Sequence, residues 1–309
     1  MAVLSFTRLS GWHDRRIFSP FLKYLLSFDS VSFFLASNLK KDYTRQILTD
    51  EQVESYQRDS YVVLRDLLTT EEKKDFVRIV GELENWPVSN DKWFTYYELV
   101  NGEKRLSRLE GFYEFHDEMV EYVNGKLGKA AADLLGEEAV VFKDKINFKY
   151  PGGVGFDPHQ DGVSWAMFEQ YFHLSALVPA NPMTLKNGCL QLVAGEFGKL
   201  PWLPQKEENG DIQEEIARNF KWDPVTCDAG TVVMFNSHVP HKSNVNETNE
   251  KRRALYITWN GISLGDTRHK YYGLRRECHP PDHMRDPNKD YSDGIKLFDE
   301  HILETAAKQ

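Results

Sequence analysis

Hydrophobic and polar positions divide the chain into a helical first part and a β-rich second part. Two helices are predicted to begin at capping boxes, in which a Thr hydroxyl and a side chain three residues later exchange hydrogen bonds with unpaired backbone N–H groups. The pairs are Thr49 with Gln52 and Thr69 with Glu72. The apolar run at 61–68 lies between them and predicts a strand.

Residues 115–135 carry apolar side chains at helical spacing, and Gly125 and Gly128 mark where this helix would divide in two. After Gly136 the pattern changes to short β runs separated by Gly, Pro and Asn. These runs lie at 139–150, 159–165, 171–180, 188–195, 228–235 and 252–260. The spacing favours an antiparallel sandwich or barrel over βαβ units, so the expected fold class is α+β and mainly β.

We expect one domain over residues 46–300, preceded by an N-terminal extension at 1–45. Within the domain, residues 201–223 form a long polar excursion between strands, and the tail beyond Asp266 is expected to be loop-rich. The extension holds seven Lys or Arg, only three acids and an aromatic-aliphatic run. This composition is typical of an organelle transit peptide, and the alternative is a helix that packs on the domain.

Composition and charge narrow the class of protein. The 309 residues are 41% hydrophobic, which is enough for a sizeable core, and they carry a net charge of −9. No basic block suits a phosphate backbone, and no apolar run approaches the roughly 18–20 residues that span a bilayer, so no nucleic-acid or membrane partner is expected. Three widely spaced cysteines argue against a disulfide framework and fit a reducing compartment. We expect a cytoplasmic monomer or homodimer, or a mitochondrial one if the extension is a transit peptide.

The candidate chemistry begins with His159 and Asp161, two positions apart. Side chains alternate along a strand, so these two would project from one face and could bind one metal ion. A third ligand would come from the segment after the strand at 228–235, as either His238 or His241. Two histidines and one carboxylate on one face of an octahedron form the facial triad of non-haem Fe(II) oxygenases, which leaves three coordination positions open.

Such an oxygenase binds a keto acid through two of the open positions and O₂ through the third. The far carboxylate of the keto acid needs an anchor, and the forked guanidinium of Arg matches a carboxylate. Arg252 and Arg253 follow the histidines in sequence, and on a regular strand only one of the two can point inward.

Several segments occur in a characteristic order: "YVVLRDLLTTEE", "KINFKYPGGVGFDPHQD", "NGCLQLVAG", "AGTVVMFNSHVPHKSNVN", "RRALYITWN" and "YYGLRRECHPPD". Together they resemble the phytanoyl-CoA dioxygenase family of Fe(II)/2-oxoglutarate oxygenases over about residues 50–295. The resemblance implies a double-stranded β-helix, a cupin-like jelly roll buttressed by N-terminal helices. It also implies Fe(II) as the metal, with 2-oxoglutarate and O₂ as cosubstrates.

The resemblance assigns roles residue by residue. His159, Asp161 and His241 match the metal ligands, and His241 is preferred over the other histidine because the family's second histidine opens an H-x-S segment. Arg252 matches the arginine, and Ser243 the serine, that hold the far carboxylate of 2-oxoglutarate.

Other polar and aromatic residues are candidates for binding the two organic substrates. Asn147 and Lys145 lie on the polar face of the strand before the first histidine and either bind 2-oxoglutarate or face solvent. The substrate pocket would contain Trp165, which on a regular strand shares the inward face, and the alternative is a core tryptophan. Arg108 would also lie in the pocket, with a solvated loop as the alternative, and Trp202 lies on an excursion that could cover the site as a lid.

The sequence therefore predicts a 2-oxoglutarate-dependent dioxygenase that hydroxylates an aliphatic C–H bond of a small organic molecule and releases succinate and CO₂. The alternative enzyme is a metal-dependent cupin hydrolase or isomerase that uses the same His/Asp/His site to activate water. Substrates of the family range from acyl-CoA thioesters to phosphonates and quaternary amines, and the sequence does not choose among them.

Overall fold

The computed structural model describes residues 43–168, 170–199, 201–206, 210–292 and 294. The chain divides into one unit at Met1–Ser37 and a second at Asn38–Gln309, and every described residue lies in the second. The expected extension at 1–45 lies almost wholly outside the described residues, so the domain bounds 46–300 stay predictions. In the described part of the chain, no helix has the length and apolar character needed to cross a membrane.

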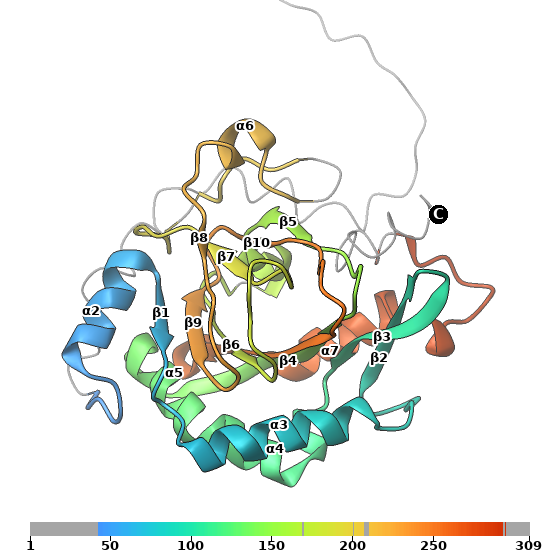
Figure 1. The fold of residues 1–309 in the computed structure, drawn as a ribbon, viewed down its shortest axis with the longest axis horizontal. Coiled ribbons are helices and arrows are strands. Elements are labelled where there is room, and N and C mark those ends of the chain that lie inside the picture. The colour runs from blue at the N-terminus through green and yellow to red at the C-terminus, as the bar shows by residue number, and fades with distance from the viewer. Residues whose placement is uncertain (1–42, 169, 200, 207–209, 293, 295–309) are drawn as a thin grey trace, which may run out of the picture. The chain divides into compact units, whose positions relative to one another are not determined.

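Two antiparallel sheets are the main feature of the described residues (Figure 1). The strands of the large sheet are, in spatial order, β1 (Tyr61–Leu64), β9 (Val232–Asn236), β6 (Leu174–Pro179), β11 (Arg252–Gly261), β4 (Ala139–Lys149), β3 (Glu103–Glu110) and β2 (Phe94–Val100). Those of the small sheet are β5 (Phe156–His159), β10 (His241–Ser243), β7 (Leu190–Leu192) and β8 (Asp223–Pro224). This arrangement confirms the mixed helix-and-sheet class with antiparallel strands.

The helices of the first part of the chain begin near the predicted positions. The helices of the described residues are α2 (Asp50–Asp59), α3 (Thr70–Glu84), α4 (Asp117–Tyr122), α5 (Gly128–Leu135), α6 (Glu214–Ala217) and α7 (Arg268–Cys278). Both capping boxes are present, at Thr49 before α2 and Thr69 before α3. The predicted helix at 115–135 is divided as expected, because Gly125 has the non-helical angles φ −75° and ψ −122° between α4 and α5.

Two segments predicted as loops are regular elements. Residues 103–110, which include Arg108 with a solvated loop as its alternative setting, form the strand β3, and the tail expected to be loop-rich contains the helix α7. Both predictions were wrong for the same reason. The charged side chains of these segments suggested contact with water, but several of them are buried in ion pairs, among them Arg108, Arg268 and Arg275.

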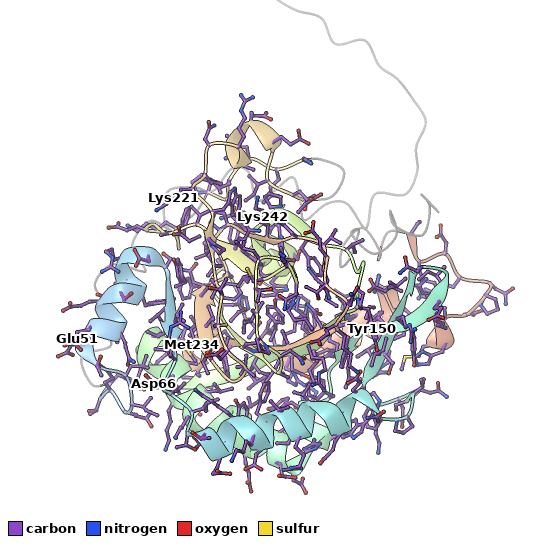
Figure 2. All side chains as sticks on the ribbon, viewed as in Figure 1. Glu51, Asp66, Tyr150, Lys221, Met234 and Lys242 are labelled. Carbon is purple, nitrogen blue, oxygen red and sulfur yellow. The ribbon has the colours of Figure 1, made fainter. Side chains whose placement is uncertain are left out.

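Helices α2 to α5 cover one face of the large sheet. Phe76 and Val80 of α3 and Leu127 before α5 pack with Leu255 and Ile257 of β11 in one apolar core. All five are fully buried, and burying a side chain of this size contributes roughly 1.5–3 kcal/mol. Charged side chains, such as the labelled Glu51 and Asp66, lie at the exposed periphery (Figure 2).

The opposite face of the large sheet faces the small sheet. Its apolar part packs Leu177 and Phe235 against residues of β7 such as Leu190. On this same face of the large sheet, β4 presents polar side chains. Two of them, Lys143 and Lys149, are only 7% and 5% exposed. The polar face of this strand is therefore an interior face and not a solvated one.

Candidate metal centre

The predicted metal ligands lie at the end of the β5–β10 pairing. His159 is the last residue of β5 and His241 the first of β10, and the two are direct partners in the antiparallel register. Asp161 begins a 3₁₀ helix (Asp161–Phe168), so the expectation of a strand running through it is wrong. The chain turns because the Gly162 N–H donates to the carbonyl of Ser237, at 3.0 Å.

The turn nevertheless brings the three predicted side chains together. Asp161 Oδ1 lies 3.9 Å from His159 Nε2, and Asp161 Oδ2 lies 3.7 Å from His241 Nε2. One ligand atom from each residue lies within 4.8 Å of the other two. Bonds from a metal to such atoms are about 2.0–2.2 Å long, so one ion can contact all three.

Backbone carbonyls orient both imidazoles. His159 Nδ1 lies 2.7 Å from the carbonyl of Asp157, and His241 Nδ1 lies 2.9 Å from that of Val239. A carbonyl can only accept, so Nδ1 carries the proton and each Nε2 keeps its lone pair for a metal. Both Nε2 atoms face Asp161.

His238, the other candidate for the third ligand, is placed differently. Its ring stacks on Trp202 with centroids 4.0 Å apart, and its Nε2 lies 2.7 Å from the carbonyl of Tyr171. Burial lowers the pKa of His238 to about 4, so it is a neutral packing residue at physiological pH.

Asp161 is in the charge state that a metal ligand requires. Burial alone would raise the pKa of this carboxyl, but the facing side chains of His241, Lys145 and His159 hold it below its usual range. Asp161 is therefore ionised at neutral pH.

Gln160, between two of the candidate ligands, joins the turn to two other segments. Its Nε2 donates to the carbonyl of His238 at 2.5 Å, and its Oε1 accepts the N–H of Leu203 at 2.9 Å. Beside it, a Cβ on Gly162 would come within 2.5 Å of the Trp202 indole. The polar excursion at 201–223 thus begins in contact with the turn that carries Asp161, and only glycine fits at position 162.

Arg252 and Ser243, the residues expected to hold the far carboxylate of 2-oxoglutarate, both lie beside Lys149. Arg252 and Lys149 are partners in the β11–β4 register, and Lys149 Nζ donates to Ser243 Oγ at 2.9 Å. Arg252 is 3% exposed and donates through Nε to the carbonyl of Asn187, at 3.3 Å. Its Nη1 is buried and has no hydrogen-bond partner among the described residues. A buried donor without an acceptor is costly, so this atom marks a place for an anionic ligand.

Arg253 points to the other side of the strand, as alternation requires. Its Nη1 lies 3.4 Å from Glu84 Oε2 on α3. Arg252 is thus the member of the pair that faces the interior.

Lys145 and Asn147 share the interior face of β4. Within the described residues Lys145 makes no hydrogen bond or ion pair, and its ammonium lies 5.1 Å from the centre of the Tyr256 ring. Burial lowers the pKa of Lys145 to about 8, with the charge of Lys143 acting in the same direction and that of Asp161 opposing both. Asn147 is half-buried two residues further along.

Two of the three predicted pocket residues, Trp165 and Arg108, lie on elements that the sequence did not predict. Trp165 lies in the 3₁₀ helix and not on a strand, and it is buried with Phe142 and Phe168, the setting of a core tryptophan. Arg108 lies on β3 opposite Asn147 and is only 5% exposed, so the alternative of a solvated loop is wrong.

Three residues of the site were not assigned a role from the sequence. Lys149 continues the alternation of Lys145 and Asn147 and could have been found from it. Tyr256 lies four residues after the interior arginine, and its pKa is raised by burial and by Asp161. Gln160 carried no signal, because its contacts depend on segments distant in sequence.

Comparison with known proteins gives the family. Residues 56–254 match the family model described as Phytanoyl-CoA dioxygenase (PhyH). The chain is 36% identical over 253 residues to the 2-aminoethylphosphonate dioxygenase of uncultured bacterium HF130_AEPn_1, which covers 81% of this chain and 96% of that protein. It is 34% identical to the methylphosphonate hydroxylase of Gimesia maris, over 74% of this chain and 87% of that protein.

A solved structure shares the fold. EctD from S. alaskensis, crystallised with 2-oxoglutarate and 5-hydroxyectoine, superposes with a TM-score of 0.61 at 22% sequence identity, over 74% of this chain and 82% of EctD. These findings confirm the resemblance, the enzyme class and the cofactors predicted from the motifs. The chain belongs to the phytanoyl-CoA dioxygenase family of Fe(II)- and 2-oxoglutarate-dependent oxygenases.

Proposed function

We propose that this dioxygenase hydroxylates a small organophosphonate, with His159, Asp161 and His241 as its iron ligands. The observation that carries the assignment of the ligands is the convergence of two imidazole Nε2 atoms and one carboxylate on a common point. The substrate class is supported by two relatives, a 2-aminoethylphosphonate dioxygenase and a methylphosphonate hydroxylase.

We also propose that the two sheets form the double-stranded β-helix of a jelly roll. Support comes from the antiparallel strands of both sheets, from the apolar core between them, and from the likeness to EctD. In this arrangement helices α2 to α5 buttress the outer face, and the metal ligands lie between the sheets.

The proposed reaction places one atom of O₂ in the product and the other in succinate. R–CH₂–PO₃²⁻, 2-oxoglutarate and O₂ give R–CH(OH)–PO₃²⁻, succinate and CO₂. Fe(II) bound by the triad would couple the oxidative decarboxylation of the keto acid to the oxidation of the C–H bond. The remaining tasks, to bind and orient the two organic substrates and to exclude water, fall to the protein.

Binding of 2-oxoglutarate is assigned to one stretch of the interior face. Arg252, Lys149 and Ser243 hold the far carboxylate, because a guanidinium, a lysine amine and a hydroxyl meet there and one guanidinium N–H lacks an acceptor. Asn147 and Lys145 follow along β4 toward Asp161, and they would contact the end of the molecule that approaches the metal.

A turnover assay with an arginine variant tests this function. We expect wild-type protein to release succinate only with Fe(II), O₂ and 2-oxoglutarate all present. Arg252→Met should raise the KM for 2-oxoglutarate by about 100-fold, since truncating one partner of a buried charge pair costs roughly 2–5 kcal/mol. Arg253→Met is the matched control and should leave this KM nearly unchanged. Hydrolysis or isomerisation that proceeds without 2-oxoglutarate would instead support the cupin alternative.

Lys149 predicts a pH dependence for cosubstrate binding. Burial, with Arg252 alongside, lowers the pKa of Lys149 to about 6, against the opposing charges of Glu98 and Cys189. A bound carboxylate favours the protonated form and so raises this pKa. The affinity for 2-oxoglutarate is therefore greatest below pH 6 and falls as pH rises, by up to about tenfold per unit, until the pKa of the complex is reached.

The measurement is the KM for 2-oxoglutarate between pH 6 and 8. We expect the slope in wild-type protein and a flatter profile in Lys149→Met. Parallel profiles in the two proteins would show that Lys149 does not contact the cosubstrate.

A further inference from the structure

The polar excursion, which contains α6 (Figure 1), is bound to the segment that carries two of the proposed metal ligands. The N–H of Ile212 donates to the carbonyl of Pro158 at 2.7 Å. The N–H of Leu203 donates to the side chain of Gln160 at 2.9 Å. These two contacts lie on either side of His159, so the excursion is held along the metal-binding segment.

Trp202, near the start of the excursion, is held on two sides. Its indole lies against Gly162, because a Cβ added at that glycine would come within 2.5 Å of the ring. A second contact is with His238, whose ring stacks on the indole with centroids 4.0 Å apart and an interplanar angle of 22°. His238 is itself fixed, since its Nε2 lies 2.7 Å from the carbonyl of Tyr171. The indole therefore cannot swing aside without losing these contacts.

This indole is not buried in the way that a core tryptophan is. Trp165 is 4% exposed and Trp259 1%, whereas Trp202 is only half-buried. A large apolar ring is thus fixed beside the turn that follows Asp161, and part of its surface stays open to a ligand.

The pairing of β5 with β10 places the triad between this indole and the residues proposed to bind 2-oxoglutarate. Ser243, one of those residues, lies at one end of the paired strands and His241 lies at the other. The turn with Asp161 follows the end that carries the histidines. The indole of Trp202 lies against that turn, and so on the far side of the triad from Ser243.

We propose that Trp202 forms one wall of the substrate site and limits the length of the carbon chain of the phosphonate, an inference that rests on the proposed function. The organic substrate has to reach the metal from a side that 2-oxoglutarate leaves open, and the indole borders such a side. Because the ring is backed by Gly162 and His238, it cannot move aside for a longer chain. One methylene more or less in an apolar pocket changes kcat/KM by roughly 10- to 200-fold.

Succinate release with methyl-, ethyl-, propyl- and butylphosphonate tests the wall. We expect kcat/KM of wild-type protein to fall by about tenfold or more at the step of this series where the chain reaches the indole. Trp202→Leu should move the fall to a longer chain. The ratio of kcat/KM for butylphosphonate to that for methylphosphonate should then rise by about tenfold or more. Trp202→Phe keeps a smaller aromatic ring, so its ratio should lie between those of the two proteins.

Two readouts separate a wall from a merely structural role. Loss of structure would lower kcat/KM for every phosphonate by the same factor and would leave the ratio unchanged. The KM for 2-oxoglutarate should stay within about threefold of wild type, because the cosubstrate residues lie on the other side of the triad. The matched control is Trp86→Leu, which also removes an indole that stacks on a histidine, His116, and should keep the wild-type ratio.

Calorimetric titration with the same phosphonates, in the presence of Fe(II) and 2-oxoglutarate but without O₂, gives a Kd for each chain length that needs no turnover. The ratio of affinities for butyl- and methylphosphonate should change as the ratio of kcat/KM does. Thermal melting shows whether each variant is folded, and Trp202→Phe decides the matter if Trp202→Leu does not fold.

The outcomes distinguish the wall from the function on which it rests. If wild-type protein binds phosphonates in the titration but releases no succinate, the proposed function fails and the Kd ratios decide the wall. If phosphonates are turned over and the ratio is the same in wild type and Trp202→Leu, the wall is wrong and the function stands. Equal kcat/KM for all four alkylphosphonates in wild-type protein would also contradict the wall. A wild-type protein that neither binds nor turns over any of them would overturn both.

Discussion

Succinate release is expected to fall by roughly 1,000-fold or more when Asp161 is replaced by Ala. The three ligands act as one unit, and removing one member of such a unit costs nearly as much activity as removing all of them. The carboxylate oxygens face both imidazole Nε2 atoms, at 3.9 and 3.7 Å. Without Asp161 the ion would keep only two protein ligands. The iron content of anaerobically loaded protein should fall along with the turnover.

Asp66→Ala provides the control for this variant, because Asp66 is an exposed aspartate that follows β1. It should retain wild-type iron content and turnover. If Asp161→Ala bound iron and turned over normally, the proposed ligand set would be wrong, even though the chain belongs to the family.

The largest expected effect on stability comes from Arg268→Met. Arg268 on α7 is 4% exposed, and its Nη2 lies 2.6 Å from Asp144 Oδ1 on β4. Asp144 is fully buried and also accepts the N–H of Phe112. Removing the guanidinium leaves a buried carboxylate without its cation, which costs about 3–5 kcal/mol. Urea denaturation measures the loss as a lower free energy of unfolding.

Two further variants make this measurement specific. Arg105→Met removes an arginine from an exposed ion pair with Glu103 and should change the free energy of unfolding little. Adding Asp144→Asn to Arg268→Met removes the uncompensated charge and should recover part of the loss. A change below about 1 kcal/mol in Arg268→Met would show that the pair adds nothing to stability.

Local signals in the sequence predicted the first helices and most strands, and together with the family resemblance they predicted which residues converge as ligands. The capping boxes at Thr49 and Thr69 begin helices because both hydrogen-bond partners lie within one turn of chain. The candidate ligands His159, Asp161 and His241 lie together although the strand expected to carry Asp161 ends before it. Residue order was therefore a better guide than the assumed backbone conformation.

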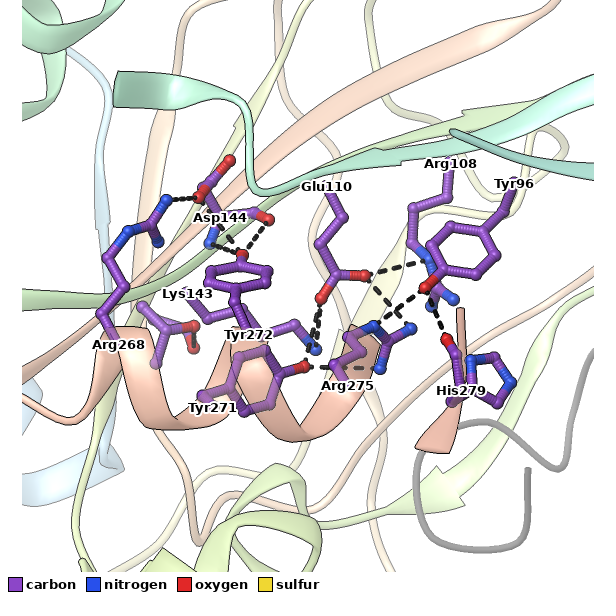
Figure 3. A network of polar contacts seen from close by, with 12 residues as sticks. Tyr96, Arg108, Glu110, Lys143, Asp144, Arg268, Tyr271, Tyr272, Arg275 and His279 are labelled. Atoms are coloured by element: carbon purple, nitrogen blue, oxygen red, sulfur yellow. Dashed lines mark hydrogen bonds and ion pairs between the residues drawn. The ribbon is translucent and has the colours of Figure 1, made fainter. Parts of the chain in front are cut away.

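The errors arose where burial depends on segments distant in sequence. Residues 103–110 read as a solvated loop because Lys104, Arg105 and Arg108 are charged. Arg108 pairs with Glu110 of the same strand, but β4, which pairs with this strand, and Arg275 of α7, which also contacts Glu110, come from distant parts of the sequence (Figure 3). The same dependence hid α7, whose two buried arginines pair with carboxylates on β3 and β4. No window of local sequence contains those partners.

The direct pairing of His159 with His241 has a consequence for how the site can fail. Their separation is set by the alignment of two short strands and not by flexible loops. A shift of β5 by one residue would send the first imidazole to the opposite side of the small sheet, since side chains alternate with a period of two. In the native alignment, an ion bound by both histidines would crosslink β5 to the three-residue β10. Removing the ion with a chelator would therefore weaken the pairing of these strands as well as abolish turnover.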